Sequence, residues 1–300
     1  MQIPLGASPP SNLISLPVIF FSGAYVLRPL LKWAGGKRSQ VKKIIELLPI
    51  DHRKRRYHEP FIGGGAVFFH IEPCGGTIND INPRLMNFYR VVRNRPNELI
   101  EEAVRYQYNK KEYYRLRARF NSGLSDEVEE AALLLYLNKT AYNGLYRVNS
   151  KGKFNVPFGR YENPTIVQEK RIVYASQLLK MVEILCEDFT YIGDTAKEGD
   201  LCYLDPPYNP VSDTANFTGY AVSGFDADDQ DRLKDLCVEL NKRGAIFVLS
   251  NSDTEFVRHL YKGIKDFRLI PLRTNRMISS KVSSRSSGHD LLITNSLRSN

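Results

Sequence analysis

The chain has 300 residues and a formal net charge of +9, from 42 Lys and Arg against 33 Asp and Glu. Its 42% hydrophobic and 25% charged fractions are typical of a soluble globular protein, and they exclude a disordered chain, a collagen and a multi-span membrane protein. The basic excess favours a polyanionic partner. The four cysteines are widely spaced, which favours a reduced, cytoplasmic setting over a zinc or redox motif.

Residues 1–26 are predicted to be an N-terminal extension outside the core fold. The apolar stretch Leu13–Leu27 is interrupted by a proline, a serine and a glycine, and the first basic residue, Arg28, comes after it. The stretch therefore lacks the positive start of a secretory signal and is short for a membrane span. We expect no membrane association.

From Lys32 onward, strands and helices are predicted to alternate along the chain. The predicted helices are Val41–Leu48, Ala66–Ile71, Asn82–Phe120, Glu127–Leu137 and Asp229–Lys242. The predicted strands are Tyr57–Phe61, Gly76–Asn79, Leu201–Leu204 and Ala245–Leu249, with a closing pair at Arg268–Leu272 and Leu291–Thr294 across a Ser-rich loop. This alternation predicts an α/β sheet with helices on both faces.

The stretch 84–184 interrupts the alternation with helices and a hairpin, and it is predicted to be an inserted domain. It holds most of the positive charge, with 18 basic and 11 acidic side chains. Within it, Tyr136–Tyr161 has five basic residues, six aromatic residues and no acid. Cations that bind phosphates, interleaved with rings that stack on bases, suit nucleic acid. A solvated hairpin with the rings in its own small core is an equal alternative.

The sharpest motif is Asp205-Pro206-Pro207-Tyr208, directly after the predicted strand Leu201–Leu204. In an open α/β sheet, ligands bind outside the carboxyl ends of the strands. The two prolines fix the backbone and donate no hydrogen bonds, which leaves the Pro206 carbonyl as an acceptor beside the Asp205 carboxylate. Two acceptors could orient an exocyclic base amine toward an electrophile while Tyr208 stacks on the base. An ordinary proline turn is the alternative.

A glycine turn is predicted in Glu59-Pro60-Phe61-Ile62-Gly63-Gly64-Gly65, between a strand and a helix. Such a turn lets a ligand approach the backbone closely. Asp80, seventeen residues after Gly63, follows the next strand, where an acidic side chain accepts hydrogen bonds from ribose hydroxyls. These features predict a nucleoside-bearing cofactor and do not separate NAD from S-adenosylmethionine.

A third motif is Leu31-Lys32-Trp33-Ala34-Gly35-Gly36-Lys37, which contains the only tryptophan of the chain. Its Gly-Gly turn could bring backbone amides and Lys37 to a carboxylate. A core tryptophan with two surface lysines is the alternative interpretation.

Together these motifs resemble the adenine-N6 DNA methyltransferases of the Dam type, the D12 class, and the chain is also similar to the methylase of the DpnII restriction system. The resemblance covers roughly residues 28–295. It implies a Rossmann-like S-adenosylmethionine-dependent methyltransferase sheet formed by 27–83 and 185–300, with 84–184 as an inserted helical and hairpin target-recognition domain. Further matching segments are Asn79–Asn82, Tyr142–Arg147, Phe154–Tyr161 and Leu249–Asn251.

The resemblance implies methyl transfer from S-adenosyl-L-methionine to N6 of adenine in duplex DNA, commonly within GATC, with base flipping. The implied catalytic residues are Asp205, Pro206, Pro207 and Tyr208. The implied cofactor-binding residues are Trp33, Lys37, Glu59, Phe61, Gly63, Gly65, Asp80, Asp194 and Asp205. The implied DNA-binding residues are Lys32, Lys139, Tyr142, Asn143, Arg147, Lys151 and Lys153.

A recognition hairpin is expected from Leu145–Val148 and Lys153–Pro157, because the residues between them have turn chemistry. Arg147 is expected to contact guanine, whereas Lys151 and Lys153 are expected to touch phosphates. No metal site is predicted, since the histidines show no ligand spacing. Double-stranded DNA is the expected partner, with no obligatory protein partner and a monomer as the expected state.

Other enzyme classes fit less well. Amino-group methyltransferases for RNA or protein glutamine usually carry Asn at the position of Asp205 and lack the Tyr136–Tyr161 hairpin. A cytosine-C5 enzyme needs a Pro-Cys nucleophile near its cofactor motif, and Pro73-Cys74 lies on a turn away from one. A dehydrogenase does not explain the Pro-Pro-Tyr segment, and a DNA-binding module without activity does not need Asp80. An orphan enzyme and the companion of a restriction nuclease are both compatible with the sequence.

Overall fold

The computed structural model of the chain describes residues 27–37, 39–208, 225–273 and 289–296. The predicted N-terminal extension and most of the Ser-rich loop between the last two strands lie outside the described residues. Within the described ranges, no helix is both long and apolar enough to cross a membrane.

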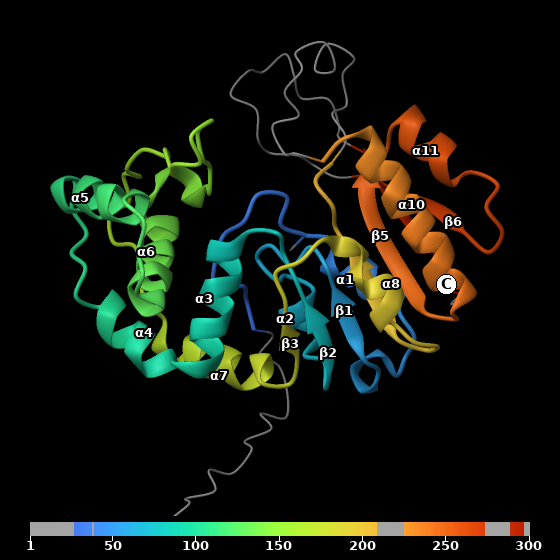
Figure 1. The fold of residues 1–300 in the computed structure, drawn as a ribbon, viewed down its shortest axis with the longest axis horizontal. Helices are drawn as coiled ribbons and strands as arrows, with labels where there is room; N and C mark the ends of the chain where they lie inside the picture. The colour runs from blue at the N-terminus through green and yellow to red at the C-terminus, as the bar shows by residue number, and fades with distance from the viewer. Residues whose placement is uncertain (1–26, 38, 209–224, 274–288, 297–300) are drawn as a thin grey trace, which may run out of the picture.

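A seven-stranded sheet in the order β3-β2-β1-β4-β5-β7-β6 forms the centre of the fold (Figure 1). The strands from β3 to β5 pair in parallel, and β7 is antiparallel to both of its neighbours. The strand order reverses between β1 and β4, which makes this pair the topological switch point. The strands are β1 (Tyr57–Glu59), β2 (Gly76–Ile78), β3 (Glu183–Ile184), β4 (Leu201–Leu204), β5 (Ile246–Ser252), β6 (Arg268–Arg273) and β7 (His289–Thr294).

The central strands are buried on both faces, and side chains alternate between two apolar clusters along β4, β5 and β7. In β4, Leu201 and Tyr203 join one cluster, whereas Cys202 and Leu204 join the other. This alternation follows from the period of two along an extended chain. It explains why the central strands have continuous apolar sequences, as expected for strands covered on both sides.

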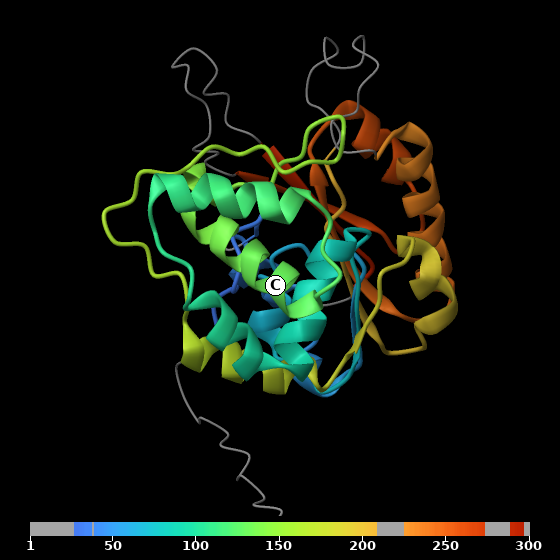
Figure 2. The same cartoon turned by 60° about the vertical axis from the view of Figure 1, so that its left-hand side comes forward.

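Helices cover both faces, as predicted. One face carries α8 (Ile192–Thr195), α10 (Ala227–Lys242) and α11 (Glu255–Tyr261), and the other carries α1 (Val41–Glu46), α2 (Phe68–Ile71), α3 (Pro83–Asn94) and α7 (Glu169–Leu179) (Figure 1). Three further helices extend to one side of the sheet (Figure 2): α4 (Pro96–Ala103), α5 (Lys110–Asn121) and α6 (Glu127–Thr140). Short 3-10 turns lie at His52–Lys54, Tyr142–Gly144 and Phe189–Tyr191.

The predicted long helix from Asn82 to Phe120 is three helices. Asn82 caps the first by accepting from the backbone N–H groups of Arg84 and Leu85. The first break occurs at Arg95, whose backbone leaves the helical region at φ −134°, because Pro96 follows it and starts the next helix. A second cap at Asn109 starts α5. Polar caps and a proline thus divide one periodic stretch.

The predicted boundary of the insertion at residue 184 needs correction, because Glu183–Ile184 is the edge strand β3 and pairs in parallel with β2. The inserted helices also share a core with the sheet. Leu85 on α3 and Ile172 on α7 belong to the same apolar cluster as Tyr203 on β4. The stretch 84–184 is therefore continuous with the body of the protein through its first and last helices.

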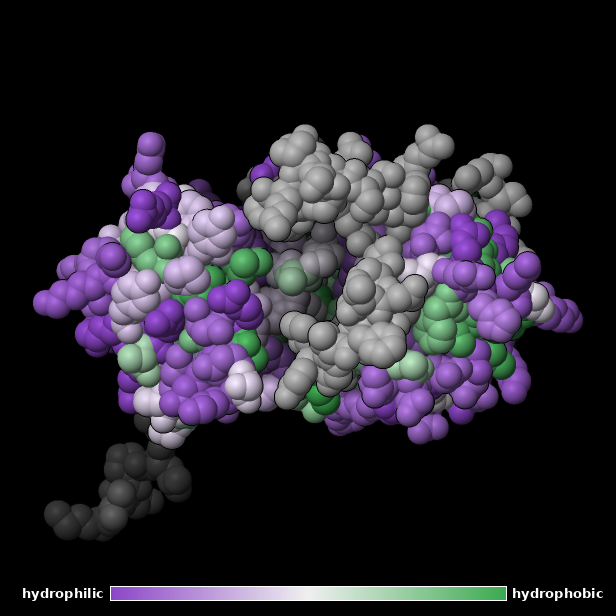
Figure 3. Space-filling view, turned by 90° about the horizontal axis from the view of Figure 1, so that it is seen from above, coloured by the Kyte–Doolittle hydropathy of each residue, from purple (hydrophilic) through white to green (hydrophobic). Residues whose placement is uncertain are grey.

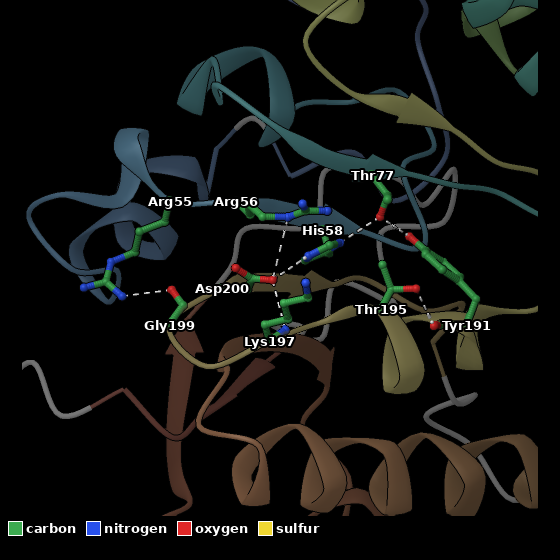
Figure 4. A network of polar contacts seen from close by, with 9 residues as sticks. All are labelled: Arg55, Arg56, His58, Thr77, Tyr191, Thr195, Lys197, Gly199 and Asp200. Atoms are coloured by element: carbon green, nitrogen blue, oxygen red, sulfur yellow. Dashed lines mark hydrogen bonds and ion pairs between the residues drawn. The ribbon is translucent and has the colours of Figure 1, made fainter.

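A buried polar network joins the amino-terminal halves of β1, β2 and β4 (Figure 4). His58 is fully buried, with Nδ1 2.8 Å from Thr77 Oγ1 and Nε2 3.2 Å from Asp200 Oδ2. The Thr77 hydroxyl lies 2.7 Å from the Tyr191 hydroxyl. Burial lowers the pKa of His58 despite the nearby Asp200 carboxylate. The network satisfies polar groups inside the sheet and lies toward the edge where β4 begins.

Candidate functional site

The carboxyl ends of three neighbouring parallel strands bring together the segments that the sequence singles out. Pro60–Gly65 follows β1, Asp80 follows β2 and Asp205 follows β4. The N–H of Ile62 donates to the Asn79 carbonyl at 2.8 Å and ties the first two segments. Figure 3 looks down onto this edge and shows many hydrophilic side chains on either side of its centre.

The glycine turn after β1 has a shape that side chains would disturb. Gly63 and Gly65 have φ values of +46° and +70°, in the region that favours glycine. Asp80 Oδ2 accepts from the Gly63 N–H at 3.1 Å, and Tyr89 Oη donates to the Gly63 carbonyl at 2.8 Å. Burial raises the pKa of Asp80. The turn and the carboxylate therefore form one rigid unit, as expected for a site that holds a nucleoside.

Asp205 and Lys37 form a largely buried ion pair. Lys37 Nζ lies 2.6 Å from Asp205 Oδ1, and the two side chains are 5% and 19% exposed. The same ammonium donates to the Gly35 carbonyl at 2.8 Å and lies 4.5 Å from the centre of the Tyr208 ring. Burial raises the pKa of Asp205, the Lys37 ammonium opposes that rise, and the Asp290 carboxylate adds to it. Lys37 thus favours the charged carboxylate.

The two prolines after Asp205 have different surroundings. Pro206 is buried and Pro207 is exposed, and Tyr208 is half-buried. No backbone hydrogen bond to the Pro206 carbonyl occurs within the described part of the chain. An acceptor carbonyl, a carboxylate and an aromatic ring therefore stand within four residues at the switch point of the sheet.

Trp33 lies directly on the glycine turn. A Cβ on Gly63 would come within 2.8 Å of Trp33 Cδ1, and one on Gly64 within 3.2 Å of Trp33 Cβ. The structure therefore brings Trp33 and Lys37 to the same edge as Asp80 and Asp205. The alternative of a core tryptophan with two surface lysines does not describe this arrangement, because Trp33 is half-buried and Lys37 is buried.

Glu59 lies beneath the turn and has protein partners. It is 2% exposed, and its Oε2 accepts from Tyr57 Oη at 2.7 Å and from the Phe68 N–H at 3.1 Å. Burial raises the pKa of Glu59 well above its ordinary value. The carboxyl group thus joins β1 to the start of α2 and supports the turn from inside.

Asp194 is not part of this group, which corrects the sequence-based prediction. Its side chain is 98% exposed, and Oδ1 lies 3.9 Å from Arg243, which ends α10 just before β5 begins. That position is at the amino edge of the sheet, opposite Asp80 and Asp205. The Gly193-Asp194 sequence lies in the short helix α8 and is directed away from the carboxyl edge by it.

The loop after β3 lies at the carboxyl edge and was missed by sequence reasoning. The Glu187 backbone N–H donates to Asn79 Oδ1 at 2.8 Å, and Asn79 Nδ2 donates back to the Glu187 carbonyl at 3.0 Å. Phe189 then packs against Phe61, with ring centres 5.2 Å apart. A two-residue strand gives little periodic signal, but Asp188-Phe189 just after an apolar run was a usable clue.

The predicted hairpin is present in a reduced form. Val148 pairs with Phe154 in an isolated bridge, and the Asn155 N–H donates to the Arg147 carbonyl at 3.1 Å. The turn at 149–152 closes with a bond from the Gly152 N–H to the Asn149 carbonyl at 2.9 Å. No longer strand ladder forms in this described segment, where the Asn121 side chain accepts from the Phe154 N–H at 2.8 Å and donates to the Phe154 carbonyl at 2.9 Å.

The predicted DNA-contacting residues of the hairpin are exposed. Tyr142 is 54% exposed, and Asn143 adopts a positive φ of +55° in the turn before Gly144. Arg147 is exposed and donates from Nε to Asn155 Oδ1 at 2.7 Å. The side chains of Lys151 and Lys153 are exposed at the turn, and all these residues are free to meet a large ligand.

The sequence left open whether the six aromatic rings of Tyr136–Tyr161 stack on bases or form a small core, and the structure places them differently from one another. Tyr136 and Phe154 are buried in the main apolar cluster, and Phe158 packs beside Tyr108 at 5.0 Å. Tyr142 is mostly exposed. Five of the six rings are therefore buried or half-buried, and Tyr142 is the exposed one.

Lys32 and Lys139 lie near each other at the base of the hairpin. The Lys32 ammonium lies 5.3 Å from the centre of the Tyr161 ring. Burial, together with the positive charges of Arg171 and Lys32, lowers the pKa of Lys139 to about 8. A half-buried ammonium among other cations suits an anionic ligand.

Comparison with known proteins identifies the chain's relatives. The family model described as D12 class N6 adenine-specific DNA methyltransferase matches residues 33–278. A type II methyltransferase of Lactococcus lactis subsp. cremoris, M1.LlaDCHI, is 42% identical over 276 residues, which cover 90% of this chain and 95% of the relative. Another from Methanocaldococcus jannaschii, M.MjaIII, is 43% identical over 289 residues, covering 90% and 99%. The DNA adenine methylase of Escherichia coli K12 is 35% identical, covering 88% and 94%.

Proposed function

This chain belongs to the D12 class N6 adenine-specific DNA methyltransferases, and we propose that it methylates adenine N6 within GATC after flipping the base into a pocket beside Asp205. The family implies S-adenosylmethionine as the methyl donor. One observation carries the proposal: the Asp205 carboxylate, its Lys37 partner and the Tyr208 ring lie together at the switch point of the sheet.

The glycine turn and Asp80 fit the donor. A Cβ on Gly63 would meet Trp33 and one on Gly65 would meet Phe69, so the two glycines let the turn pack tightly against these rings, and the donor would lie against the backbone of that turn. Each Asp80 oxygen accepts one backbone N–H and retains capacity for hydroxyl donors, as a ribose presents. When bound, S-adenosylmethionine supplies an electrophilic methyl group. Trp33, Phe61, Gly63, Gly65 and Asp80 would hold it in place, with Glu59 supporting the turn from beneath.

The four residues after β4 would orient the target amine. The adenine amine is a weak nucleophile because its lone pair is delocalised into the ring. The Asp205 carboxylate and the Pro206 carbonyl would accept its two hydrogens, and this geometry would direct the lone pair outward. Tyr208 would stack on the base, and Pro207 would hold the backbone extended. The Lys37 ammonium opposes the rise of the Asp205 pKa and so favours the charged carboxylate, which can accept.

DNA would approach along the hairpin and the basic residues at its base. The adenine amine lies in the major groove of a duplex and reaches a recessed carboxylate only when the base is flipped. Arg147 would contact guanine, while Tyr142 and Asn143 would support the site around the flipped base. Lys32 would contact the recognition site, Lys151 and Lys153 would contact phosphates, and Lys139 would make a further DNA contact. Residues 84–184, with the edge strand β3 excluded, would be the recognition part.

The test is the single-turnover rate of methyl transfer to a GATC duplex by Asp205→Ala. Loss of a charge-assisted hydrogen bond made in the transition state costs about 3 kcal/mol or more, so we expect the rate to fall at least about a hundredfold. Asp51→Ala is the matched control, since Asp51 also pairs with a cation, Arg55, at 2.9 Å, but precedes β1. A transfer rate for Asp205→Ala within about threefold of wild type would overturn the assignment.

Site specificity has its own readout. Sequencing of modified adenines in DNA from cells that express the protein should show methylation at GATC and at no other frequent site. Methylation centred on a different sequence would refute GATC while leaving the methyltransferase activity intact.

A further inference from the structure

Trp33 lies between the glycine turn and the hairpin and contacts both. Toward the turn, its Cδ1 occupies the space that a Cβ on Gly63 would need, at 2.8 Å. On the other side it stacks on Tyr146, with ring centres 4.9 Å apart and 20° between the planes. A shift of Trp33 would therefore change its contacts with both the turn and the hairpin.

Tyr146 belongs to the hairpin and packs against a second hairpin ring, Phe154. Its ring lies 5.7 Å from that of Phe154, which is buried and forms the Val148–Phe154 bridge. The next residue along the chain is Arg147. Asn155 holds Arg147 from across the hairpin, through the Arg147 carbonyl and Nε, and the Tyr146 ring anchors the neighbouring residue on the same strand. Tyr146 is therefore well placed to control the position of the hairpin.

A set of hydrogen bonds also holds the segment that contains Trp33 against the start of the hairpin. Asn138 on α6 accepts from the Lys32 N–H at 2.8 Å and donates to the Lys32 carbonyl at 2.7 Å. Its amide also donates to the Gly144 carbonyl at 3.2 Å. A Cβ on Gly144 would come within 2.3 Å of Lys32 Cδ, so glycine permits this close approach. Asn138 thus fixes the backbone at Lys32 against that at Gly144. The Trp33–Tyr146 stack is a side-chain contact between the same two segments, one and two residues further along the chain.

We propose that Tyr146 is a positioning residue that couples methyl-donor binding to DNA binding through its stack on Trp33. The inference rests on the proposed function and adds a physical connection between the methyl-donor site and the DNA site. A donor seated against the glycine turn would contact Trp33, and DNA seated on the hairpin would hold Tyr146. Each ligand would stabilise the same stacked arrangement, so once one ligand has bound the second binds more tightly. Thermodynamic linkage makes this effect reciprocal.

The experiment measures this coupling directly. The affinity of a labelled GATC duplex is determined by fluorescence anisotropy with and without saturating S-adenosylhomocysteine, which cannot react. For the wild type we expect the duplex to bind at least about fivefold more tightly with S-adenosylhomocysteine. Tyr146→Leu keeps an apolar side chain and removes the ring, and should reduce the ratio to less than about twofold. Tyr146→Phe keeps the ring and should restore it.

Intrinsic fluorescence gives a second readout, because Trp33 is the only tryptophan in the chain. Its emission should change when the duplex binds to the wild type and to Tyr146→Phe, and should stay constant in Tyr146→Leu. Tyr114→Ala is the matched control: Tyr114 is a 36% exposed ring on α5 that contacts Arg117. This control should retain full coupling.

The outcomes separate the two proposals. A wild type that binds and methylates GATC without coupling, or a Tyr146→Leu variant that keeps the coupling, overturns the role of Tyr146 alone. A wild type with no affinity for the duplex overturns the proposed function. A Tyr146→Leu variant that loses coupling while keeping the wild-type affinity for S-adenosylhomocysteine alone supports the inference, because general unfolding would abolish that affinity.

Discussion

Replacement of Lys37 by methionine should move the acid limb of the pH–rate profile upward. The Lys37 ammonium is the cation that opposes the rise of the Asp205 pKa caused by burial, and the Asp290 carboxylate adds to that rise. Without the ammonium, burial acts unopposed and the pKa of Asp205 rises further. A larger fraction of Asp205 is then protonated at a given pH, and a protonated carboxyl has lost acceptor capacity for the target amine.

The magnitude follows from the geometry of the pair. At 2.6 Å and an effective dielectric constant of about 20, the gross attraction is about 6 kcal/mol. Desolvation of both groups cancels much of it, and an opposite charge at contact distance typically shifts a carboxyl pKa by about 1–3 units. The acid limb should therefore move up by about 1–3 pH units. At a pH below both pKa values, the rate relative to its own plateau should be about 10- to 1000-fold lower than in the wild type.

The assay is single-turnover methyl transfer at saturating donor and duplex across the pH range. Saturation removes any effect of Lys37 on donor affinity. Lys37→Arg retains a cation and should keep the wild-type acid limb. If the profiles of Lys37→Met and the wild type share one acid limb, Asp205 is not the group that titrates and its proposed role as acceptor is wrong.

Three further predictions follow from the hairpin, the Tyr208 ring and the buried histidine. Arg147→Ala should relax discrimination at one base pair by about 1–3 kcal/mol, measured as methylation rates on all single-base variants of GATC. Lys151→Ala should instead weaken binding to every duplex alike and lower the salt dependence of binding by about one ion. If Arg147→Ala slows methylation of every duplex by the same factor, Arg147 is a phosphate contact. With 2-aminopurine at the target position, fluorescence should rise on binding and rise less with Tyr208→Ala; no rise with bound wild type would argue against flipping. Because burial lowers the pKa of His58, the unfolded chain binds more protons below its own His pKa of about 6.5, so the free energy of unfolding should fall there by up to about 1.4 kcal/mol per pH unit. His58→Gln should flatten that part of the curve in urea unfolding, and an unchanged slope would mean that His58 does not titrate in this range.

Much of the sheet could be predicted from local sequence, because the signals are local. Leu201–Leu204 is a strand with the predicted bounds, and the predicted closing pair at the end of the chain is present; the structure shows that it is antiparallel. Glycine and proline turns mark strand ends, and strand ends in a parallel sheet are where ligands bind. The clustering of Lys37, Asp80 and Asp205 at one edge could therefore be expected before any coordinates.

The contacts between residues that are far apart in the sequence were decided only by the tertiary structure. Asp194 has a suitable side chain, but the short helix that carries it is directed to the amino edge of the sheet. The ion pair of Lys37 with Asp205 joins residues 168 positions apart, and nothing in either segment specifies that distance. Composition alone could not decide which aromatic residues of the basic hairpin are buried, since that depends on which helices pack against it. The contact between Trp33 and Tyr146 arises in the same way, because side-chain stacking across more than a hundred residues is determined only once the whole core has formed.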